Sequence, residues 1–463
     1  MTHATAPSQT IDQLRADLDG HVLEPADPDF ATATAVFYGQ PLSPALLVRA
    51  ASTADVVRTI AFARETGLEL AVRSGGHSNA GHSSTDGGVV LDLSPMTAID
   101  LDLADRSVWA ETGLTAAQLS TAVAAHGLAI GFGDTGSVGI GGITNGGGVG
   151  YLVRKHGLTI DNVLAAEIVT ADGAVILADA DHEPDLFWAI RGGGGNMGVV
   201  TRFRYRLHEV PTIVGGMLLL PATAAVIAGF VREAAAAPDE LSAIVNIMPA
   251  PPMPMVPAEL HGTPVVMALM AVTADAEAGA SALAPFRALA TPIADLLRPM
   301  TYPELFPPED PGYHPVAVGR TFFMDEVDEA IAARIVDRIE EHLRTTNAQM
   351  AVCQLRVLGG AADRVPVEAT AYAHRGRRIM GNVAALVPTR DDLAAHTPWV
   401  EAFAAELRGD VPGAYVNFLA DEGPERVHDA YPGATWDRLA AIKARFDPTN
   451  LFHRNQNVPP ARG

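Results

Sequence analysis

A loop around His77 holds the residues best suited to chemistry. It reads Val-Arg-Ser-Gly-Gly-His-Ser over residues 72–78, and residues 131–150 contain ten glycines in twenty positions. Because glycine lets backbone amides come close to an anion, such runs can form a cradle for a pyrophosphate without basic side chains. Arg106 is the only Lys or Arg between residues 74 and 153. We therefore expect a nucleotide cofactor that is bound largely by backbone.

The glycines allow other interpretations. Residues 131–136 match the G-x-G-x-x-G dinucleotide fingerprint, which needs a helix whose N-terminus meets the pyrophosphate. Gly139, Gly141 and Gly142 follow at once, so we expect no helix there, and a nicotinamide-binding Rossmann domain is not favoured. The glycines could also form only tight turns, although a third run at 192–198 makes that interpretation weaker.

His77 stands directly after an expected strand, where a ring nitrogen could meet a cofactor. His82 is five residues further on with no cysteine nearby, so the spacing does not predict a metal pair. A lone histidine is more often an ordinary surface or core residue. The residues alone leave both interpretations of His77 open.

Composition narrows the class of protein. A chain of 463 residues is too long for one core and predicts two domains. The net charge of −22 argues against nucleic acid or an anionic membrane as a partner. No apolar segment reaches 18 residues, and residues 1–20 do not read as a secretory signal. The single cysteine, Cys353, excludes an intramolecular disulfide, so we expect a cytoplasmic protein.

Hydrophobic periodicity and turn residues predict an α/β layout up to Pro211. Asp172-Gly173 is a strong hairpin turn between two of the strands. The expected helices cover 53–65, 114–126 and 185–190, and the expected strands cover 68–72, 89–93, 107–111, 163–170, 174–177 and 199–207.

From Val214 the chain reads as a second, α+β domain around an antiparallel sheet. The expected strands cover 265–272, 351–358 and 378–386, and the expected helices cover 224–235 and 326–345. A last strand at 413–418 and a last helix at 436–446 complete the prediction.

Short motifs spread along nearly the whole chain resemble one family. They include Arg-Ser-Gly-Gly-His-Ser at 73–78, Val-Gly-Ile-Gly-Gly at 138–142, Leu-Phe-Trp-Ala-Ile-Arg-Gly-Gly at 186–193, Tyr-Val-Asn at 415–417 and Asp-Pro-Thr-Asn-Leu-Phe at 447–452. Together they resemble the FAD-linked oxidases of vanillyl-alcohol-oxidase (PCMH) type, in the berberine-bridge-enzyme-like branch. The resemblance implies an α+β, two-domain PCMH-type FAD-binding fold. It implies an FAD-binding domain at 1–212 (core about 42–212), a substrate-binding domain with an antiparallel sheet at 213–411, and a returning C-terminal segment at 412–463.

The resemblance also implies how FAD is held. In this family the histidine of the matched loop, here His77, is joined to the flavin 8α-methyl group. Many members add a cysteinyl link, but Thr135 stands at that position here, and a hydroxyl is not a thiolate nucleophile. We therefore expect a single histidyl link. The expected cofactor-binding residues are Arg73, Ser74, Gly75, Gly76, His77, Ser78, Thr135, Gly136, Ser137, Val138, Gly141, Gly142, Asn145, Gly148, Gly198, Val199, Val200, Asn417 and Asn455, with no metal.

By the same resemblance, the reaction is hydride transfer from an alcohol or amine C–H to the flavin, which O2 then reoxidises to give H2O2. Tyr415 is the expected base on its Tyr-x-Asn strand, and His374 and Tyr372, on a substrate-domain strand, are the second candidates. An unperturbed tyrosine with a pKa near ~10 is a poor base at neutral pH, so Tyr415 could instead only position the substrate.

Several functions share these motifs. A flavin dehydrogenase with another electron acceptor, an oxidative tailoring enzyme of secondary metabolism and a non-catalytic flavin- or sugar-binding protein remain alternatives to an oxidase. The expected partners are a small-molecule substrate and O2, in a bacterial monomer or homodimer. The sequence does not identify the donor.

Overall fold

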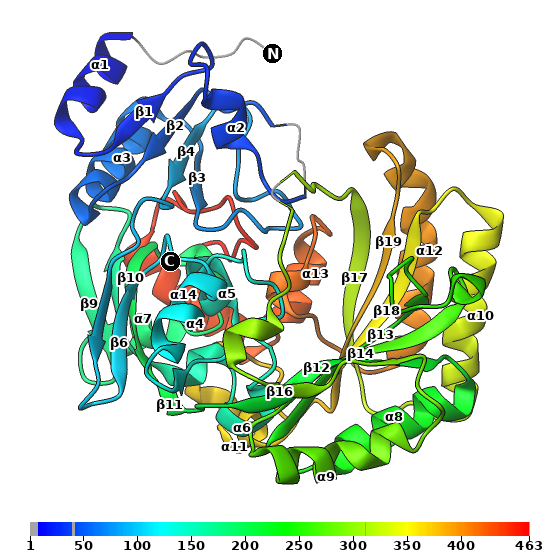
Figure 1. Cartoon of the computed structure of the whole chain (residues 1–463). Coiled ribbons are helices and arrows are strands. Elements are labelled where there is room, and N and C mark those ends of the chain that lie inside the picture. The colour runs from blue at the N-terminus through cyan, green and yellow to red at the C-terminus, as the bar shows by residue number, and fades with distance from the viewer. Residues whose placement is uncertain (1–7, 39–41, 311, 463) are drawn as a thin grey trace.

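Three main β-sheets organise the chain (Figure 1). The computed structural model describes residues 8–38, 42–310 and 312–462. Two sheets and their helices form one half of the molecule, and a large antiparallel sheet with outer helices forms the other (Figure 1). The predicted α+β class is confirmed.

The first sheet carries the His77 loop. Its order is β1 (His21–Leu23), β2 (Leu46–Arg49), β4 (Val89–Asp92) and β3 (Leu70–Arg73), and the last three strands are parallel. Helix α3 (Thr53–Thr66) begins at its Ser52 cap and ends at Gly67, whose φ of 70° suits glycine. All of β4 is buried, as expected for a central parallel strand. The chain leaves β3 directly into the His77 loop.

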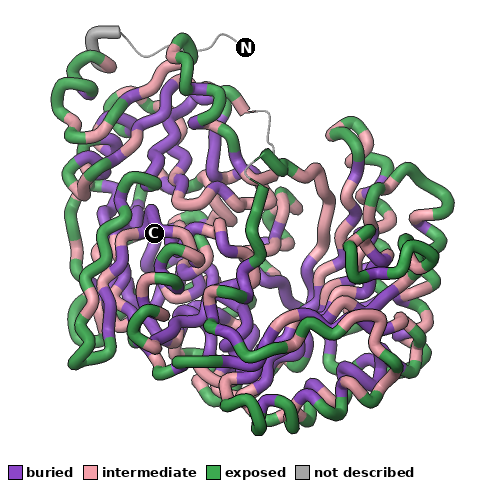
Figure 2. The backbone as a smooth tube through the Cα atoms, in the orientation of Figure 1, coloured by how far each residue is buried: buried purple, intermediate pink, exposed green. Residues whose placement is uncertain are grey.

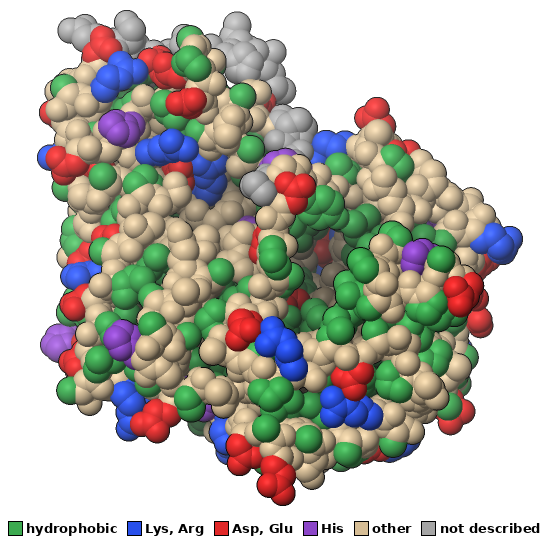
Figure 3. Space-filling model, in the orientation of Figure 1, with side chains coloured by type: hydrophobic (Ala, Val, Ile, Leu, Met, Phe, Trp, Pro, Cys, Tyr) green, Lys and Arg blue, Asp and Glu red, His purple; other side chains and the backbone are tan. Residues whose placement is uncertain are grey.

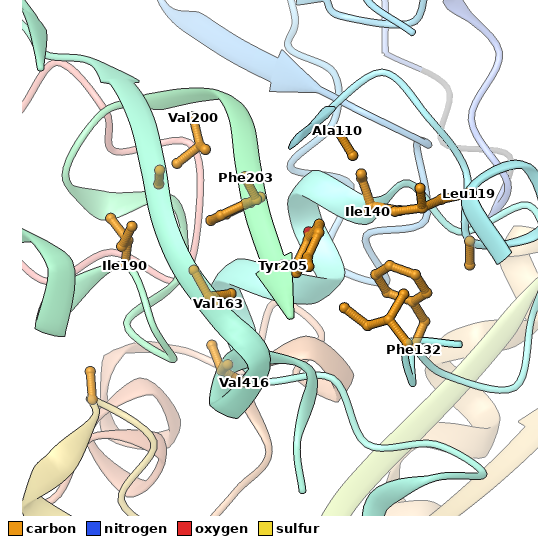
Figure 4. Close-up of a cluster of buried hydrophobic side chains, with 14 of the residues drawn as sticks. Ala110, Leu119, Phe132, Ile140, Val163, Ile190, Val200, Phe203, Tyr205 and Val416 are labelled. Atoms are coloured by element: carbon orange, nitrogen blue, oxygen red, sulfur yellow. The ribbon is translucent and has the colours of Figure 1, made fainter. Parts of the chain in front are cut away.

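The second sheet supports the glycine run at 131–150. Its strands follow the order β5 (Ile99–Asp102), β6 (Ser107–Glu111), β10 (Val199–Arg206), β8 (Val163–Val169) and β9 (Val175–Asp179). The predicted hairpin between β8 and β9 is confirmed. Tyr205 on β10 shares a hydrogen bond with Thr144 of α5 (Ile140–Gly146), and its ring packs edge-on against Phe132 at 5.9 Å (Figure 4). These buried contacts fix α5 on the sheet.

The large sheet lies between Ile213 and Leu386. Its strands follow the order β15 (Ala294–Asp295), β12 (Ile213–Pro221), β14 (Pro264–Val272), β13 (Leu241–Pro249), β18 (Met350–Val357), β19 (Ile379–Leu386) and β17 (Ala317–Met324), and β16 (Arg298–Met300) also pairs with β12. Helices α8 (Ala224–Ala236), α9 (Ala276–Arg287), α10 (Glu329–Thr345) and α12 (Leu393–Arg408) cover its outer side (Figure 1). The strands are largely buried, whereas these helices expose their outer faces (Figure 2).

The C-terminal segment returns to the first half. Helices α13 (Pro424–Ala430) and α14 (Ala434–Phe446) precede a tail without regular structure. Lys443 on α14 is fully buried, lies 2.8 Å from the Asp447 carboxylate, and donates to the carbonyls of Asn196 and Phe452. A buried charge is tolerated only with such partners. This pair therefore fastens the tail beside the third glycine run.

Predictions of local structure are wrong at the last expected strand and in the second glycine run. Residues 413–415 form no strand, and Val416–Phe418 is a turn of 3₁₀ helix. Gly413 has a φ of 125°, and a Cβ there would lie 2.8 Å from the His374 ring, so tertiary packing bends this segment. A helix does begin inside the glycine run, at Ile140, because the Ile140 amide donates to the Leu114 carbonyl and its side chain is buried.

None of the helices in the described ranges combines the length and apolar character needed to cross a bilayer. On the face in Figure 3 the surface is hollowed between the two halves, with hydrophobic side chains around the hollow.

Candidate active site

A cavity of about 320 Å³ lies where the two halves and the C-terminal segment meet. Its wall contains the His77 loop, parts of the second and third glycine runs, and residues 415–419, 452 and 454–456, with Arg356 from the large sheet. Ligand pockets in proteins commonly measure about 300–1,000 Å³. This cavity is therefore large enough to be the principal ligand site.

Most of the residues predicted for cofactor binding reach this wall. Those that line it, with Tyr415, are Ser74, Gly75, Gly76, His77, Ser78, Thr135, Val138, Gly141, Gly142, Asn145, Gly198, Val199, Val200, Asn417 and Asn455. Arg73, Gly136, Ser137, Gly148, Tyr372 and His374 do not line it.

The His77 loop is held by direct contact between two backbones. A Cβ added to either Gly75 or Gly139 would lie 2.2 Å from the amide nitrogen of the other glycine. Ser74 donates its hydroxyl to the Thr112 carbonyl and accepts from the Gly141 amide at 3.3 Å. No side chain larger than hydrogen fits between the loops. This contact sets the position of His77 relative to the second glycine run.

The His77 ring is fixed on two sides. Its Nε2 lies 2.8 Å from the Ser137 hydroxyl, and the ring stacks on Phe37 with centroids 4.3 Å apart. Burial lowers the pKa of His77 to about 4, although Glu309 opposes the shift. The imidazole is therefore neutral at pH 7, and one ring nitrogen keeps a lone pair that can act as a nucleophile.

The predicted residues behind the wall support it. Arg73, at the end of β3, pairs with the buried Asp92 at 2.8 Å. The Gly136 carbonyl accepts from the Ala117 amide at 2.9 Å, and the Gly148 amide donates to the Tyr415 hydroxyl. These residues position others, and none of the three lines the cavity.

Tyr415 is the wall residue best suited to proton transfer. Its hydroxyl oxygen accepts from the Gly148 amide at 2.9 Å and from the Asn417 side-chain amide at 3.0 Å. Burial raises the pKa of Tyr415, while Asn417, Gly148 and the Arg356 charge act in the opposite direction. Because both lone pairs of the Tyr415 oxygen accept these two hydrogen bonds, its hydroxyl proton takes part in neither of them.

The other two candidate bases lie away from the wall. The predicted strand for Tyr372 and His374 is wrong, because both residues belong to the loop before β19. Gly192 lies directly against Tyr372, and Gly413 lies directly against His374. His374 Nε2 bonds the Ala430 carbonyl at 3.1 Å, and burial lowers the pKa of His374 to about 4. Tyr372 is buried with no hydrogen-bond partner among the described residues, and burial raises its pKa.

Sequence reasoning missed an ion pair on the wall. Arg356 on β18 donates to the Asp134 carboxylate at 2.8 Å and to the Val149 carbonyl, and its side chain is only 5 % exposed. Its guanidinium also lies 5.0 Å from the centre of the Phe418 ring. The available signal was a single arginine within a largely apolar strand. Because arginine is rarely buried without a partner, this pattern indicates a buried ion pair.

The wall has the unpaired polar atoms and the space that a large polar ligand needs. Asn145 Oδ1, Asn455 Oδ1 and both ring nitrogens of His82 are buried without a hydrogen-bond partner in the described part of the chain. Such groups are costly unless a ligand or water satisfies them. Cβ atoms added at Gly142 or Gly195 would meet nothing within 4 Å. A flat ring system with a polyhydroxylated, anionic tail fits this set of residues.

Comparison with known proteins supports an FAD site in this chain. A family model described as FAD binding domain matches residues 44–179, and one described as berberine and berberine like matches 414–459. An uncharacterized FAD-linked oxidoreductase of Bacillus subtilis is 30 % identical, over 96 % of this chain and 99 % of that protein. The (R)-6-hydroxynicotine oxidase of Paenarthrobacter nicotinovorans is 29 % identical, over 96 % and 97 %.

Solved structures show the same fold. The crystal structure of 6-hydroxy-D-nicotine oxidase from Arthrobacter nicotinovorans superposes with a TM-score of 0.84 at 25 % identity, over 96 % of this chain and 98 % of that one. Xylooligosaccharide oxidase from Myceliophthora thermophila superposes with a TM-score of 0.85 at 23 % identity, over 98 % and 100 %.

The fold and the matched domains together define an FAD-dependent oxidoreductase of PCMH type. Within that class, the chain belongs to the berberine-bridge-enzyme-like FAD-linked oxidoreductases, as its sequence motifs predicted.

Gly142→Ala tests whether the flavin occupies the cavity beside α5. The added Cβ meets no protein atom but enters the cavity, so FAD content should fall. The flavin-free protein should unfold at the same or a higher temperature, because Ala favours a helix over Gly by about 1 kcal/mol. Flavin absorbance per chain and thermal unfolding measure the two effects.

Gly139→Ala is the matched control, because its Cβ would strike the Gly75 backbone and should destabilise the flavin-free protein as well. Full FAD content in Gly142→Ala would mean that the flavin lies elsewhere.

Proposed function

We propose that this chain is an oxidase that removes hydride from a C–H bond of a small alcohol or amine and passes the electrons to O2, giving H2O2. The observation that carries the proposal is that His77 and Tyr415 line one cavity with the three glycine runs. Two relatives bear the names of oxidases, one of a hydroxynicotine and one of xylooligosaccharides. Their names support an amine or an alcohol as the donor.

The cofactor is held by residues already on the wall. When bound, FAD supplies the two-electron acceptor that the side chains lack. The glycine runs offer backbone amides, and Asn145 and Asn455 offer unpaired side-chain oxygens for the polar part of FAD. His77, neutral and fixed by Ser137 and Phe37, is the residue for the covalent link to the 8α-methyl group.

A second link is not proposed. Thr135 lines the cavity where other members carry a cysteine, and its hydroxyl stays protonated at neutral pH. Cys353 is fully buried in β18 and does not line the cavity, and burial raises the pKa of its thiol. His77 therefore holds the flavin alone.

Tyr415 takes the proton that the donor loses. An alcohol or amine gives up its O–H or N–H proton as its C–H hydride leaves, so an acceptor must lie on the cavity wall. The two N–H donors on the Tyr415 oxygen and the charge of Arg356 stabilise the phenolate. Burial outweighs them and raises the pKa of Tyr415, so the reactive deprotonated form grows as the pH rises.

The remaining wall indicates what the donor looks like. Phe37, Tyr38 and Phe418 present aromatic rings, and the Asp134–Arg356 pair adds polar atoms. Aromatic walls favour flat or ring-shaped ligands, and the few polar groups orient them. A cyclic donor with a hydroxyl or amine group fits this combination.

The link through His77 predicts a simple result. Acid precipitation of the native protein should leave the flavin in the pellet, whereas His77→Ala should release it into the supernatant. His82→Ala is the matched control, because this histidine lines the same cavity and should keep the flavin attached. Colour that stays with the His77→Ala pellet would contradict the link.

Tyr415→Phe should slow flavin reduction by about 10²-fold or more, the usual contribution of a general base. Donor binding should be unchanged, because only the hydroxyl is lost. Anaerobic stopped-flow mixing with an alcohol and amine panel measures both, and admitted air should restore the flavin colour. The wild-type rate should rise with pH well into the alkaline range, because the pKa of Tyr415 is raised above the ordinary tyrosine value.

Tyr372→Phe is the control, because its hydroxyl does not line the cavity and should not affect the rate. An unchanged rate in Tyr415→Phe removes this residue from the mechanism, and flavin that air cannot reoxidise contradicts the oxidase.

A further inference from the structure

A hydrogen-bonded chain runs from His77 to Glu309 through Ser137. His77 Nε2 lies 2.8 Å from Ser137 Oγ, and the Ser137 hydroxyl contacts the Glu309 carboxylate. The Ser137 amide donates to the same carboxylate at 3.0 Å. Glu309 therefore holds Ser137 at two points.

The direction of the protons follows from the chemistry of the three groups. An ionised carboxylate has no proton to donate, so Ser137 donates its hydroxyl proton to Glu309. The Ser137 oxygen must then accept from His77, which places the imidazole proton on Nε2. The lone pair of the neutral ring is consequently on Nδ1.

The loop that carries Glu309 is fastened across the two halves. It leaves a 3₁₀ helix at Tyr302–Leu305, where the Tyr302 hydroxyl accepts from the Phe132 amide at 3.3 Å. Phe306 is buried against Gly136, where a Cβ would lie 3.1 Å from the phenylalanine Cβ. Further along, His314 Nδ1 bonds the Val36 carbonyl at 3.0 Å. Glu309 itself is exposed, but the residues just before it are packed against the first half of the molecule.

We propose that Ser137 and Glu309 form a proton relay that promotes attachment of the flavin to His77 Nδ1. Ser137 touches the reacting histidine, and Glu309 is a positioning residue that acts through it. This inference rests on the covalent link of the proposed function, and deepens it by naming the residues that make the link form.

The relay carries a proton that the attachment must release. Nδ1 forms a bond to the 8α-carbon, one 8α C–H bond breaks, and Nε2–H loses its proton, since a singly alkylated neutral imidazole has none. Together, the 8α-methyl group and the His77 imidazole lose two protons and two electrons. When bound, the isoalloxazine ring would supply the acceptor for the two electrons, and O2 would remove them from it as H2O2. The Nε2 proton passes to Ser137 as the Ser137 proton passes to the Glu309 carboxylate.

The test measures the rate of attachment apart from binding. Full-length protein from riboflavin-starved cells is mixed with FAD in air, and acid-stable flavin is followed with time at several FAD concentrations. Ser137→Ala and Glu309→Gln should attach flavin about 10²-fold more slowly at saturating FAD, as for loss of a general base. The FAD concentration for half-saturation should not change, and Ser137→Thr should keep the rate.

Asp310→Asn is the matched control, because it removes a charge from the adjacent residue, whose carboxylate accepts only from the Gly312 amide among the hydrogen bonds of the described chain. It should attach flavin at the native rate. Attachment at the native rate in both Ser137→Ala and Glu309→Gln would overturn the relay. A flavin peptide linked through Nε2, determined by NMR, would also overturn the relay, because Nε2 is the nitrogen that contacts Ser137.

These outcomes are separate from failure of the proposed function. If the native chain yields no acid-stable flavin, or if His77→Ala still yields acid-stable flavin, the histidyl link is wrong. The relay is then wrong as well, because it depends on that link. If the native chain attaches flavin through His77 and the two relay variants attach it equally fast, only the relay is wrong.

Discussion

The contact between the backbones of Gly75 and Gly139 is the constraint on which the site depends. Each glycine occupies the space in which the other would carry a Cβ. The contact brings the end of a parallel sheet against a loop that leads into a helix on a different sheet. His77 and Ser137 lie on either side of it, so their hydrogen bond follows from a packing contact that no side chain makes.

The C-terminal segment completes a cavity that the first half cannot close alone. Lys443 and Asp447 form a buried ion pair, and Lys443 also donates to the carbonyls of Asn196 and Phe452. These bonds place Asn455 beside the third glycine run, where it donates to the Gly195 carbonyl. Because a buried ion pair is costly to break, the tail is a fixed part of the wall. Tyr415 reaches the cavity through the same segment, so this segment positions both the cavity wall and the proposed proton acceptor.

Sequence patterns predicted the elements that have a local signal, such as the apolar face of α3 and the Asp172-Gly173 turn between β8 and β9. They failed where distant residues decide the backbone. Residues 413–418 read as a strand, but the His374 ring and the left-handed region of Gly413 bend them. The helix at Ile140 was missed because its glycines suggest a loop, whereas burial of Ile140 and Thr144 stabilises it. Glu309 had no motif, since its contact with Ser137 depends on a loop from the other half of the molecule.

The central proposal is one flavin held by one histidine. The most direct measurement is mass spectrometry of flavin-bearing peptides after proteolysis of the denatured native protein. A single histidyl link predicts one such peptide, which contains His77, with Thr135 and Cys353 recovered unmodified. No flavin-bearing peptide, or flavin on a peptide that lacks His77, would contradict it.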